Sequence, residues 1–365
     1  MTPSGRRAWL APEVVRASSM DCGPAALKCL LDGFGRPASY GRLREACQTS
    51  VDGTSIDTLE TVARQLGLNA EQLMWPADHV ALGRHGAAPA LVVLQQPEVG
   101  THFVVVWRRV GRRVQLMDPA GGRRWADVDE LRSQLHRHRT EVDAAQWRQW
   151  AGSTEHTDAL LERCAALGLR RRAADGLMRA ALDDPGWYGL AALDAALRAV
   201  RQLVDAGAIG RGAQAQRLLR HLLDRLAADP AAACTLVADE LWSVRPLAAG
   251  QLQLRGAVLL RVNGRLRAED AEATGVSPPS AELASVLTER QPSLTATLWW
   301  LLRHDGRVAP LALALAVLLA SAGVALELLL FRGLFDLSAT LGGTGQRGAA
   351  ALALLALLGV LLLLK

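Results

Sequence analysis

Apolar residues recur at helical spacing in the first part of the chain and then give way to short, strongly apolar runs. Leucines follow Cys22 at intervals of three and four residues until Gly33, which predicts a helix that starts at Cys22. A second amphipathic stretch covers residues 53–67. From 72 to 118 the pattern changes to β-branched and aromatic runs bounded by glycine and proline, which favours strands. Helices followed by an antiparallel sheet predict an α+β domain over residues 1–150.

The middle of the chain returns to helical periodicity. Apolar positions recur at helical spacing in three stretches, 158–182, 188–206 and 212–228. Two short β-like runs follow, 252–255 and 257–262, and they predict a strand pair. No catalytic cluster stands out here. We therefore expect residues 151–295 to be a helical linker region with a short strand pair.

Two long apolar runs lie near the C-terminal end. The run 308–331 has a single charged residue, Glu327, and the run 348–364 is slightly shorter. A helix rises about 1.5 Å per residue, so the first run can cross a hydrocarbon core about 30 Å thick. We expect residues 296–365 to be the start of a transmembrane domain, and the chain to be a piece of a longer protein.

Composition narrows the possible functions. The net charge of +5 comes almost entirely from arginine and is spread along the chain, and aromatic residues make up only 4%. Without a basic tail or aromatic platform, nucleic acid is not an expected partner. The five cysteines form no CxxC pair and are odd in number, which fits free thiols in a reducing compartment. No histidine shows metal-ligand spacing with a cysteine or another histidine, so no metal site is expected.

Cys22 has the features of a nucleophile. Asp21 is a good N-cap residue, so Cys22 is expected at a helix N-terminus, where free N–H groups and the positive dipole end favour a thiolate. His102 begins a strand, and Asp118 ends the next one after a turn near Gly111. In an antiparallel pair these two side chains meet at the same end. A single cysteine is more often a buried small hydrophobe, but these two partners favour a Cys–imidazole–carboxylate site.

The same residues carry a resemblance to a known family. Residues 14–27, which contain the motif DCGPA, together with Gly53-Thr54-Ser55, Thr101-His102-Phe103 and Met117-Asp118-Pro119, resemble the bacteriocin-processing, double-glycine-leader cysteine peptidase domain. That domain is papain-like and lies in the cytosol at the N-terminus of ABC exporters. The resemblance covers about residues 12–145. It implies Cys22 as nucleophile, His102 as base and Asp118 as the residue that orients the base.

One position departs from the family pattern. The family has a glutamine six residues before the cysteine that donates to the oxyanion, and this chain has Arg16 there. The loss of one oxyanion donor typically lowers the rate by ~10²–10³. Arg16 is a possible substitute donor, Ser18 is another, and a third possibility is a solvated arginine beside a weakened site.

The resemblance leads to a first functional hypothesis and two rivals. The first is a cysteine peptidase that removes a double-glycine leader from a ribosomal peptide, coupled to export at the bacterial inner membrane. The second is a degenerate peptidase-like domain that acts as a non-catalytic substrate receptor of the exporter. The third is a membrane-anchored regulatory protein whose helical middle region binds a partner.

The resemblance also implies partners, and the sequence bears on one cofactor, ATP. The implied partners are a leader-bearing precursor, an ABC nucleotide-binding domain, the membrane, and a second copy of the chain through the transmembrane domain. Neither lysine of the chain follows a glycine, so these residues contain no P-loop. We therefore expect ATP only if a nucleotide-binding domain follows Lys365 or is a separate chain.

Overall fold

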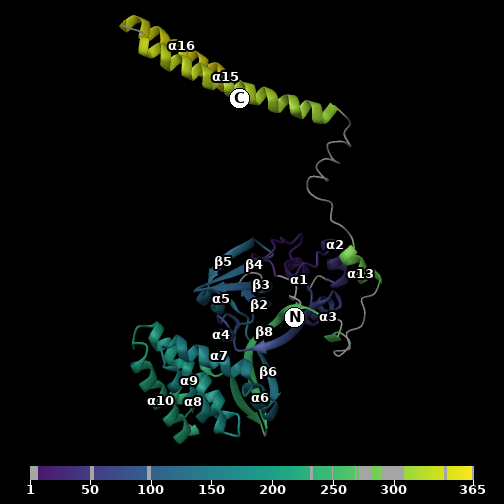
Figure 1. Cartoon of the computed structure of the whole chain (residues 1–365), viewed down its shortest axis with the longest axis vertical. Helices are drawn as coiled ribbons and strands as arrows, with labels where there is room; N and C mark the ends of the chain where they lie inside the picture. Colours follow the sequence, from purple (N-terminus) through teal and green to yellow (C-terminus); the bar gives the residue numbers. More distant parts are fainter. Residues whose placement is uncertain are drawn as a thin grey trace. The chain divides into compact units, whose positions relative to one another are not determined.

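The computed structural model describes residues 7–49, 53–96, 100–230, 233–248, 250–267, 269–270, 281–288, 308–340 and 343–363. They belong to two compact units, Met1–Arg290 and Gln291–Lys365, which are described separately below (Figure 1). The boundary predicted at 295/296 lies outside the described residues. The boundary predicted at 150/151 lies inside the first unit and stays a prediction.

Three helices form the N-terminal part of the first unit: α1 (Cys22–Gly33), α2 (Tyr40–Ala46) and α3 (Ile56–Gln65). The helix predicted to start at Cys22 is confirmed. One face of α1 is completely buried because its leucines lie three and four residues apart and pack against β3, where Trp107 is also fully buried. At the end of α1, Gly33 lies directly under the Trp107 ring, so the absence of a side chain permits the close approach.

An antiparallel sheet forms the centre of the unit. Its strands follow the order β1-β8-β2-β3-β4-β5, and β6 and β7 both pair with β8. The bounds are β1 (Leu68–Trp75), β2 (Ala90–Gln96), β3 (Gly100–Val110), β4 (Arg113–Asp118), β5 (Gly122–Asp127), β6 (His138–Asp143), β7 (Val244–Ala248) and β8 (Gln251–Arg265). Helices first and an antiparallel sheet second are thus confirmed, and the fold is α+β.

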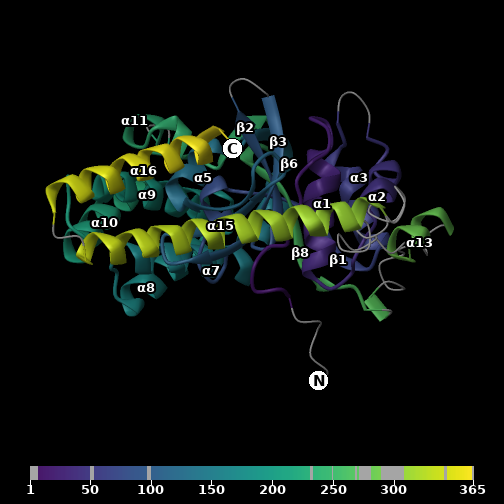
Figure 2. The ribbon, with the colours of Figure 1, turned by 90° about the horizontal axis from the view of Figure 1, so that it is seen from above.

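The strand pair predicted at 252–255 and 257–262 is wrong. These residues form the single long strand β8, which passes straight through Gly256. An added Cβ at Gly256 would lie 2.4 Å from the Trp75 carbonyl oxygen, so glycine here marks a close approach of β1 and not a turn. Strand β8 lies between β1 and β2 and pairs with both, and Figure 2 shows β8 beside β1.

Short helices and a strand complete the first 151 residues, and they were not anticipated from the sequence. They are α4 (Ala77–Val80), α5 (Val128–Gln134) and α6 (Ala144–Ala151), with β6 between the last two. Both α5 and α6 have an aspartate N-cap, Asp127 and Asp143, whose side chain accepts from the backbone N–H groups of the first turn. The cap residues mark these starts in the sequence, but the helices are too short to show clear periodicity.

The helical middle region has a core of its own. Its elements are α7 (Thr154–Ala166), α8 (Arg171–Asp183), α9 (Tyr188–Asp205), α10 (Ala213–Ala228), α11 (Ala233–Leu236) and the 3-10 turn η2 (Asp239–Leu241). Buried residues of α7 to α10 form one apolar cluster with Trp147 and with Leu252 and Leu254 of β8. Figure 2 shows α1–α3 and α7–α10 on either side of the strands. This region is therefore a helical layer packed on the sheet; α13 (Ala281–Thr288) lies beside α2.

The described residues of the second unit form the helices α15 (Val308–Thr340) and α16 (Thr344–Leu363). Within α15, the stretch Ala314–Gly333 is long and apolar enough to cross a membrane, and it is the one such stretch among the described residues. The first predicted span thus has a counterpart in α15. The second predicted span coincides with α16 up to Leu363, its last residue lies outside the described part, and its membrane crossing stays a prediction.

Candidate active site

Cys22 is the first residue of α1 and is half-buried. The preceding loop turns sharply, because the Asp21 N–H donates to the Ser18 carbonyl oxygen at 3.2 Å. Asp21 occupies the N-cap position, as predicted, but its side chain does not cap the helix. Pro24 has no N–H and the Ala25 N–H donates to the Asp21 carbonyl oxygen at 3.0 Å, so the N–H groups of Cys22 and Gly23 are those that the Asp21 carboxylate leaves uncapped at this helix end.

His102 and Asp118 come together at one end of the sheet. In the β3–β4 ladder Val105 pairs with Met117, so the residues just beyond this pair lie at the same edge. The His102 Nε2–H donates to Asp118 Oδ1 at 2.7 Å, and the same carboxylate oxygen accepts from the Ala120 N–H at 2.9 Å. Both side chains are almost completely buried. The hydrogen bond fixes the ring orientation of His102 and leaves Nδ1 for another partner.

The surroundings of Cys22 stabilise its thiolate. Burial by itself raises the pKa of the Cys22 thiol, but hydrogen bonds from the His102 ring and the Phe103 N–H outweigh burial, so the pKa is lowered from its ordinary value. The other described thiols behave differently: burial raises the pKa of Cys47 to about 12 and that of Cys164 to about 11, and it also raises the pKa of Cys29. Among the thiols that the structure describes, Cys22 alone is activated.

The charge of His102 is stabilised from two sides. Burial lowers the pKa of His102, but the hydrogen bonds with Asp118 and Cys22 outweigh burial and raise the pKa to about 9. For Asp118, burial raises the carboxyl pKa, whereas the hydrogen bonds from His102 and the Ala120 N–H lower it, and the net shift is downward. The three pKa shifts all favour the charged forms: a thiolate at Cys22, an imidazolium at His102 and a carboxylate at Asp118.

Arg16 lies close to this site and is turned toward its own loop. Its backbone N–H donates to the Pro119 carbonyl oxygen at 2.9 Å, which ties the loop before Cys22 to the segment after Asp118. Its guanidinium Nη1 donates to the Ser19 carbonyl oxygen at 3.1 Å. The Ser18 hydroxyl accepts a long contact from the Met20 N–H, 3.5 Å. Both candidate oxyanion donors thus have contacts within residues 18–20.

A network that the sequence analysis missed holds the loop in front of Cys22. The carboxylate of Asp21 is fully buried; its Oδ1 lies 2.9 Å from Arg44 Nε, and its Oδ2 accepts from the Tyr40 hydroxyl at 3.4 Å. The Tyr40 hydroxyl also accepts from the Ala17 N–H at 3.2 Å. Tyr40 and Arg44 are four residues apart on α2 and therefore share a face, which is the sequence signal that could have identified them.

No group of three or more His, Cys, Asp or Glu side chains that could hold a metal ion occurs among the described residues.

Residues 11–139 match the Peptidase C39 family. This part of the chain is thus similar to the C39 cysteine peptidases and has an α+β, papain-like fold, and the resemblance inferred from the DCGPA and His102–Asp118 segments is confirmed for it.

Two curated relatives each match about a third of the chain. Over 118 residues it is 25% identical to the lactococcin-G-processing and transport ATP-binding protein LagD of Lactococcus lactis subsp. lactis, covering 32% of this chain and 17% of that protein. Over 111 residues it is 27% identical to the pediocin PA-1 transport/processing ATP-binding protein PedD of Pediococcus acidilactici, covering 30% of this chain and 15% of that protein. The matched part spans less than a fifth of either relative.

Solved structures also resemble the domain. A double glycine motif protease from an AMS/PCAT transporter, in complex with the leader peptide, is 21% identical; the match covers 37% of this chain and 89% of that one, with a TM-score of 0.31. The peptidase domain of Streptococcus ComA, a bi-functional ABC transporter, is 20% identical, and the match covers 34% and 92% of the two chains, with a TM-score of 0.32.

Proposed function

We propose that the C39-type domain of this chain is an active cysteine endopeptidase that removes a double-glycine leader from a ribosomal peptide. The observation that supports this most directly is the activated thiol: Cys22 has a lowered pKa and hydrogen-bonds to His102, which in turn donates to Asp118 at 2.7 Å. A nucleophile, a base and a group that orients the base are the parts that thiol proteolysis needs.

The proposed reaction uses these three side chains in turn. The Cys22 thiolate attacks the carbonyl carbon of the second glycine and forms a carbon–sulfur bond, while the carbonyl electrons move to oxygen. The tetrahedral intermediate collapses, the carbon–nitrogen bond breaks, and the imidazolium of His102 gives its proton to the leaving amine. Water then attacks the thioester and gives a proton to His102, which releases the leader carboxylate and the thiolate. Asp118 keeps the ring oriented and stays ionised throughout.

The test is cleavage of a double-glycine leader peptide by the purified chain. Cys22→Ala should abolish cleavage, whereas Cys47→Ala, which removes a buried thiol with a raised pKa, should leave it nearly unchanged. Iodoacetamide near neutral pH should label Cys22 before Cys29, Cys47 or Cys164, because the thiolate is the reactive form. Full cleavage by the Cys22→Ala variant would overturn the proposal.

The setting of the peptidase is part of the same proposal. The names of LagD and PedD describe processing and transport ATP-binding proteins, and this chain matches only a small part of each. We propose that leader removal is coupled to export through a transmembrane domain that begins at α15, at the bacterial inner membrane, with a nucleotide-binding domain in cis or in trans. A leader-bearing precursor and a second copy of the chain are the proposed partners.

A second candidate function is a substrate receptor that binds the leader without cleaving it. Arg16 favours this function, because it replaces the glutamine expected from the resemblance and its guanidinium is bonded to Ser19. The two functions differ in one measurement. The receptor would bind a double-glycine leader peptide and leave it intact on prolonged incubation, whereas the peptidase would convert it to two products.

A further inference from the structure

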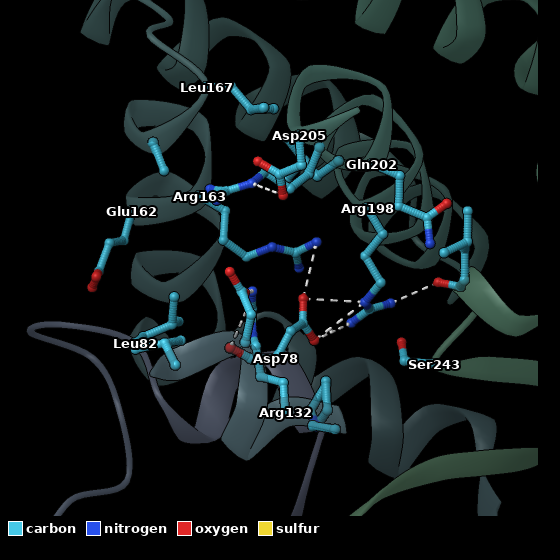
Figure 3. A pocket seen from close by; sticks show the side chains of 18 of the residues that line it. Asp78, Leu82, Arg132, Glu162, Arg163, Leu167, Arg198, Gln202, Asp205 and Ser243 are labelled. Atoms are coloured by element: carbon cyan, nitrogen blue, oxygen red, sulfur yellow. Dashed lines mark hydrogen bonds and ion pairs between the residues drawn. The ribbon is translucent and has the colours of Figure 1, made fainter. Parts of the chain in front are cut away.

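A cavity of about 720 Å³ lies inside the first unit, away from the peptidase site. Its walls come from the far end of β3 and the turn after it, from α4 and α5, from α7 and α9, and from η2 and β8. Figure 3 shows part of the lining. His102 and Arg109 lie seven residues apart on β3, so the cavity wall at Arg109 is about 20 Å from the catalytic pair. A cavity of this volume has the size of a small-molecule site.

Cationic side chains outnumber anionic ones in the lining of the cavity. Nine arginine side chains face five carboxylate side chains in its lining. At the floor, Asp78 pairs with Arg163 at 3.2 Å and with Arg198 at 3.0 Å, as Figure 3 shows. Beneath the floor the fully buried Asp194 pairs with the same two arginines and accepts from the Ser243 hydroxyl. The two floor arginines are thus neutralised within the protein.

Most of the other carboxylates in the lining already have partners. Glu162 accepts from three successive backbone N–H groups, those of Gly83, Arg84 and His85, at 2.6 to 3.2 Å. Asp129 pairs with Arg112 and Arg132, each at 3.2 Å. Asp205 pairs with Arg201 one turn away at 2.6 Å.

Four arginines of the lining lack such a partner. Within the part of the chain that the structure describes, no carboxylate forms an ion pair with Arg109, Arg137, Arg211 or Arg255. Arg109 donates instead to the carbonyl oxygens of Ala81 and Gly111.

Two of these arginines are destabilised as cations. Burial lowers the pKa of Arg109; the Glu162 carboxylate opposes this shift, the positive charges of Arg132 and Arg201 add to it, and the net shift is downward. Burial also lowers the pKa of Arg255, together with the neighbouring Arg139, Arg245 and Arg137. Arg109 and Arg255 are partly buried, whereas Arg137 and Arg211 are exposed. A surplus of mutually repelling guanidinium groups is unfavourable for folding, and an anion in the cavity relieves this repulsion.

We propose that this cavity binds a small polyanion with two or more phosphate or carboxylate groups, held by Arg109 and Arg255. Guanidinium groups donate in a planar fork that matches both kinds of oxyanion, and the hydrogen bonds are charge-assisted. Arg109 and Arg255 line the cavity from the sheet, and Arg211 lines it from the helical layer. The bound anion therefore stabilises the packing of the α7–α10 layer on the sheet.

The test is thermal unfolding of the full chain in detergent at low salt, with tripolyphosphate, citrate or orthophosphate added. Tripolyphosphate or citrate should raise the Tm as its concentration rises, because a ligand that binds only the folded state stabilises it. Orthophosphate should act only weakly, since it offers a single group. A shift with tripolyphosphate alone identifies a phosphate ligand, and a shift with citrate alone identifies a carboxylate ligand.

Matched variants distinguish anion binding in the cavity from general charge screening. Arg109→Gln and Arg255→Gln should each reduce the ligand-induced Tm shift at least several-fold. Arg171→Gln removes an arginine that is 91% exposed on α8, outside the cavity, and should leave the shift unchanged. An absence of any shift with both polyanions, or an equal shift in all three variants, would overturn the proposal. Leader cleavage, measured in parallel, depends on Cys22, so its loss would count against the peptidase and not against this site.

Discussion

At the scale of single residues, the site distributes charge over three side chains. The lowered pKa of Cys22 and the pKa of about 9 for His102 leave a range of pH in which the thiolate and the imidazolium coexist. Below this range the thiol takes up a proton, and above it the imidazolium loses one. The rate of leader cleavage should therefore have a bell-shaped pH profile whose alkaline limb lies near pH 9.

The Asp118→Asn variant tests the origin of that alkaline limb. The hydrogen bond to the Asp118 carboxylate raises the pKa of His102, so its loss lowers that pKa and moves the alkaline limb to lower pH. The weaker imidazolium also stabilises the thiolate less, so iodoacetamide labelling of Cys22 at neutral pH should slow. Asp129→Asn, a change of an exposed carboxylate on α5, is the matched control. An unchanged alkaline limb in Asp118→Asn would show that Asp118 does not raise the pKa of His102.

The Arg16→Gln variant tests the oxyanion position. We expect turnover of a leader peptide to rise, by up to ~10²-fold if the glutamine restores a full oxyanion donor. The backbone bond from residue 16 to Pro119 does not depend on the side chain and should be kept. A large fall in turnover would instead give Arg16 a positive role, such as contact with an acidic leader residue. Steady-state kinetics that separate kcat from KM distinguish these outcomes.

At the scale of elements, the packing of α1 on β3 positions Cys22 relative to His102. Cys22 is at one end of α1 and Gly33 at the other, where a Cβ would come within 2.1 Å of the Trp107 ring. Trp107 is fully buried, and its Nε1–H donates to the Ala8 carbonyl oxygen at 3.1 Å, so the ring has little freedom to move. Any side chain at residue 33 therefore shifts α1 against the sheet.

The Gly33→Ala variant should lose stability by about 1–3 kcal/mol, as overpacking of a core does. Gly41→Ala is the control, because that glycine lies within α2 with no neighbouring atoms around its Cβ position, and it should gain roughly 0.5–1 kcal/mol. Urea unfolding of the two variants measures both effects. Equal stability of Gly33→Ala and the unchanged chain would mean that α1 moves freely relative to β3.

At the scale of the whole molecule, β8 brings a late segment of the first unit's sequence into the sheet formed by its early segments. This strand lies more than a hundred residues after the sheet's other central strands, yet it is the partner of β1 and pairs with β2 as well. Leu259, Leu260 and Val262 of β8 are fully buried in the cores on the two faces of the sheet. A piece of chain that ends at residue 150 would expose those edges and cores.

A comparison of two fragments tests this dependence. The fragment 1–290 should unfold cooperatively, whereas 1–150 should unfold at lower urea concentration and bind more of a dye that reports exposed apolar surface. A peptide of residues 250–267 added to 1–150 should partly restore stability. Equal stability of the two fragments would show that the first 150 residues form a complete domain.

The membrane arrangement is also a property of the whole chain. We predict that residues 1–295 face the cytosol and that the first span, 308–331, exits outward. Arg290, Arg303 and Arg307 precede this span, against Arg332 and Arg347 in the loop after it, which is a small excess of positive charge on the inner side. Protease added to right-side-out vesicles should spare the Cys22 domain, and protease added to inverted vesicles should digest it. Digestion in the opposite orientation would contradict both the topology and cytosolic leader processing.

The local pattern of the sequence was enough to determine the helix at Cys22, the strands around His102 and Asp118, and the family to which residues 11–139 are similar. These features depend on spacing, caps and turns, which act over a few residues. The place of β8, the bonds from Tyr40 and Arg44 to Asp21, and the arginine-lined cavity were decided only by the tertiary structure. Each of them joins residues far apart in the chain, through pairing and burial that no local period encodes.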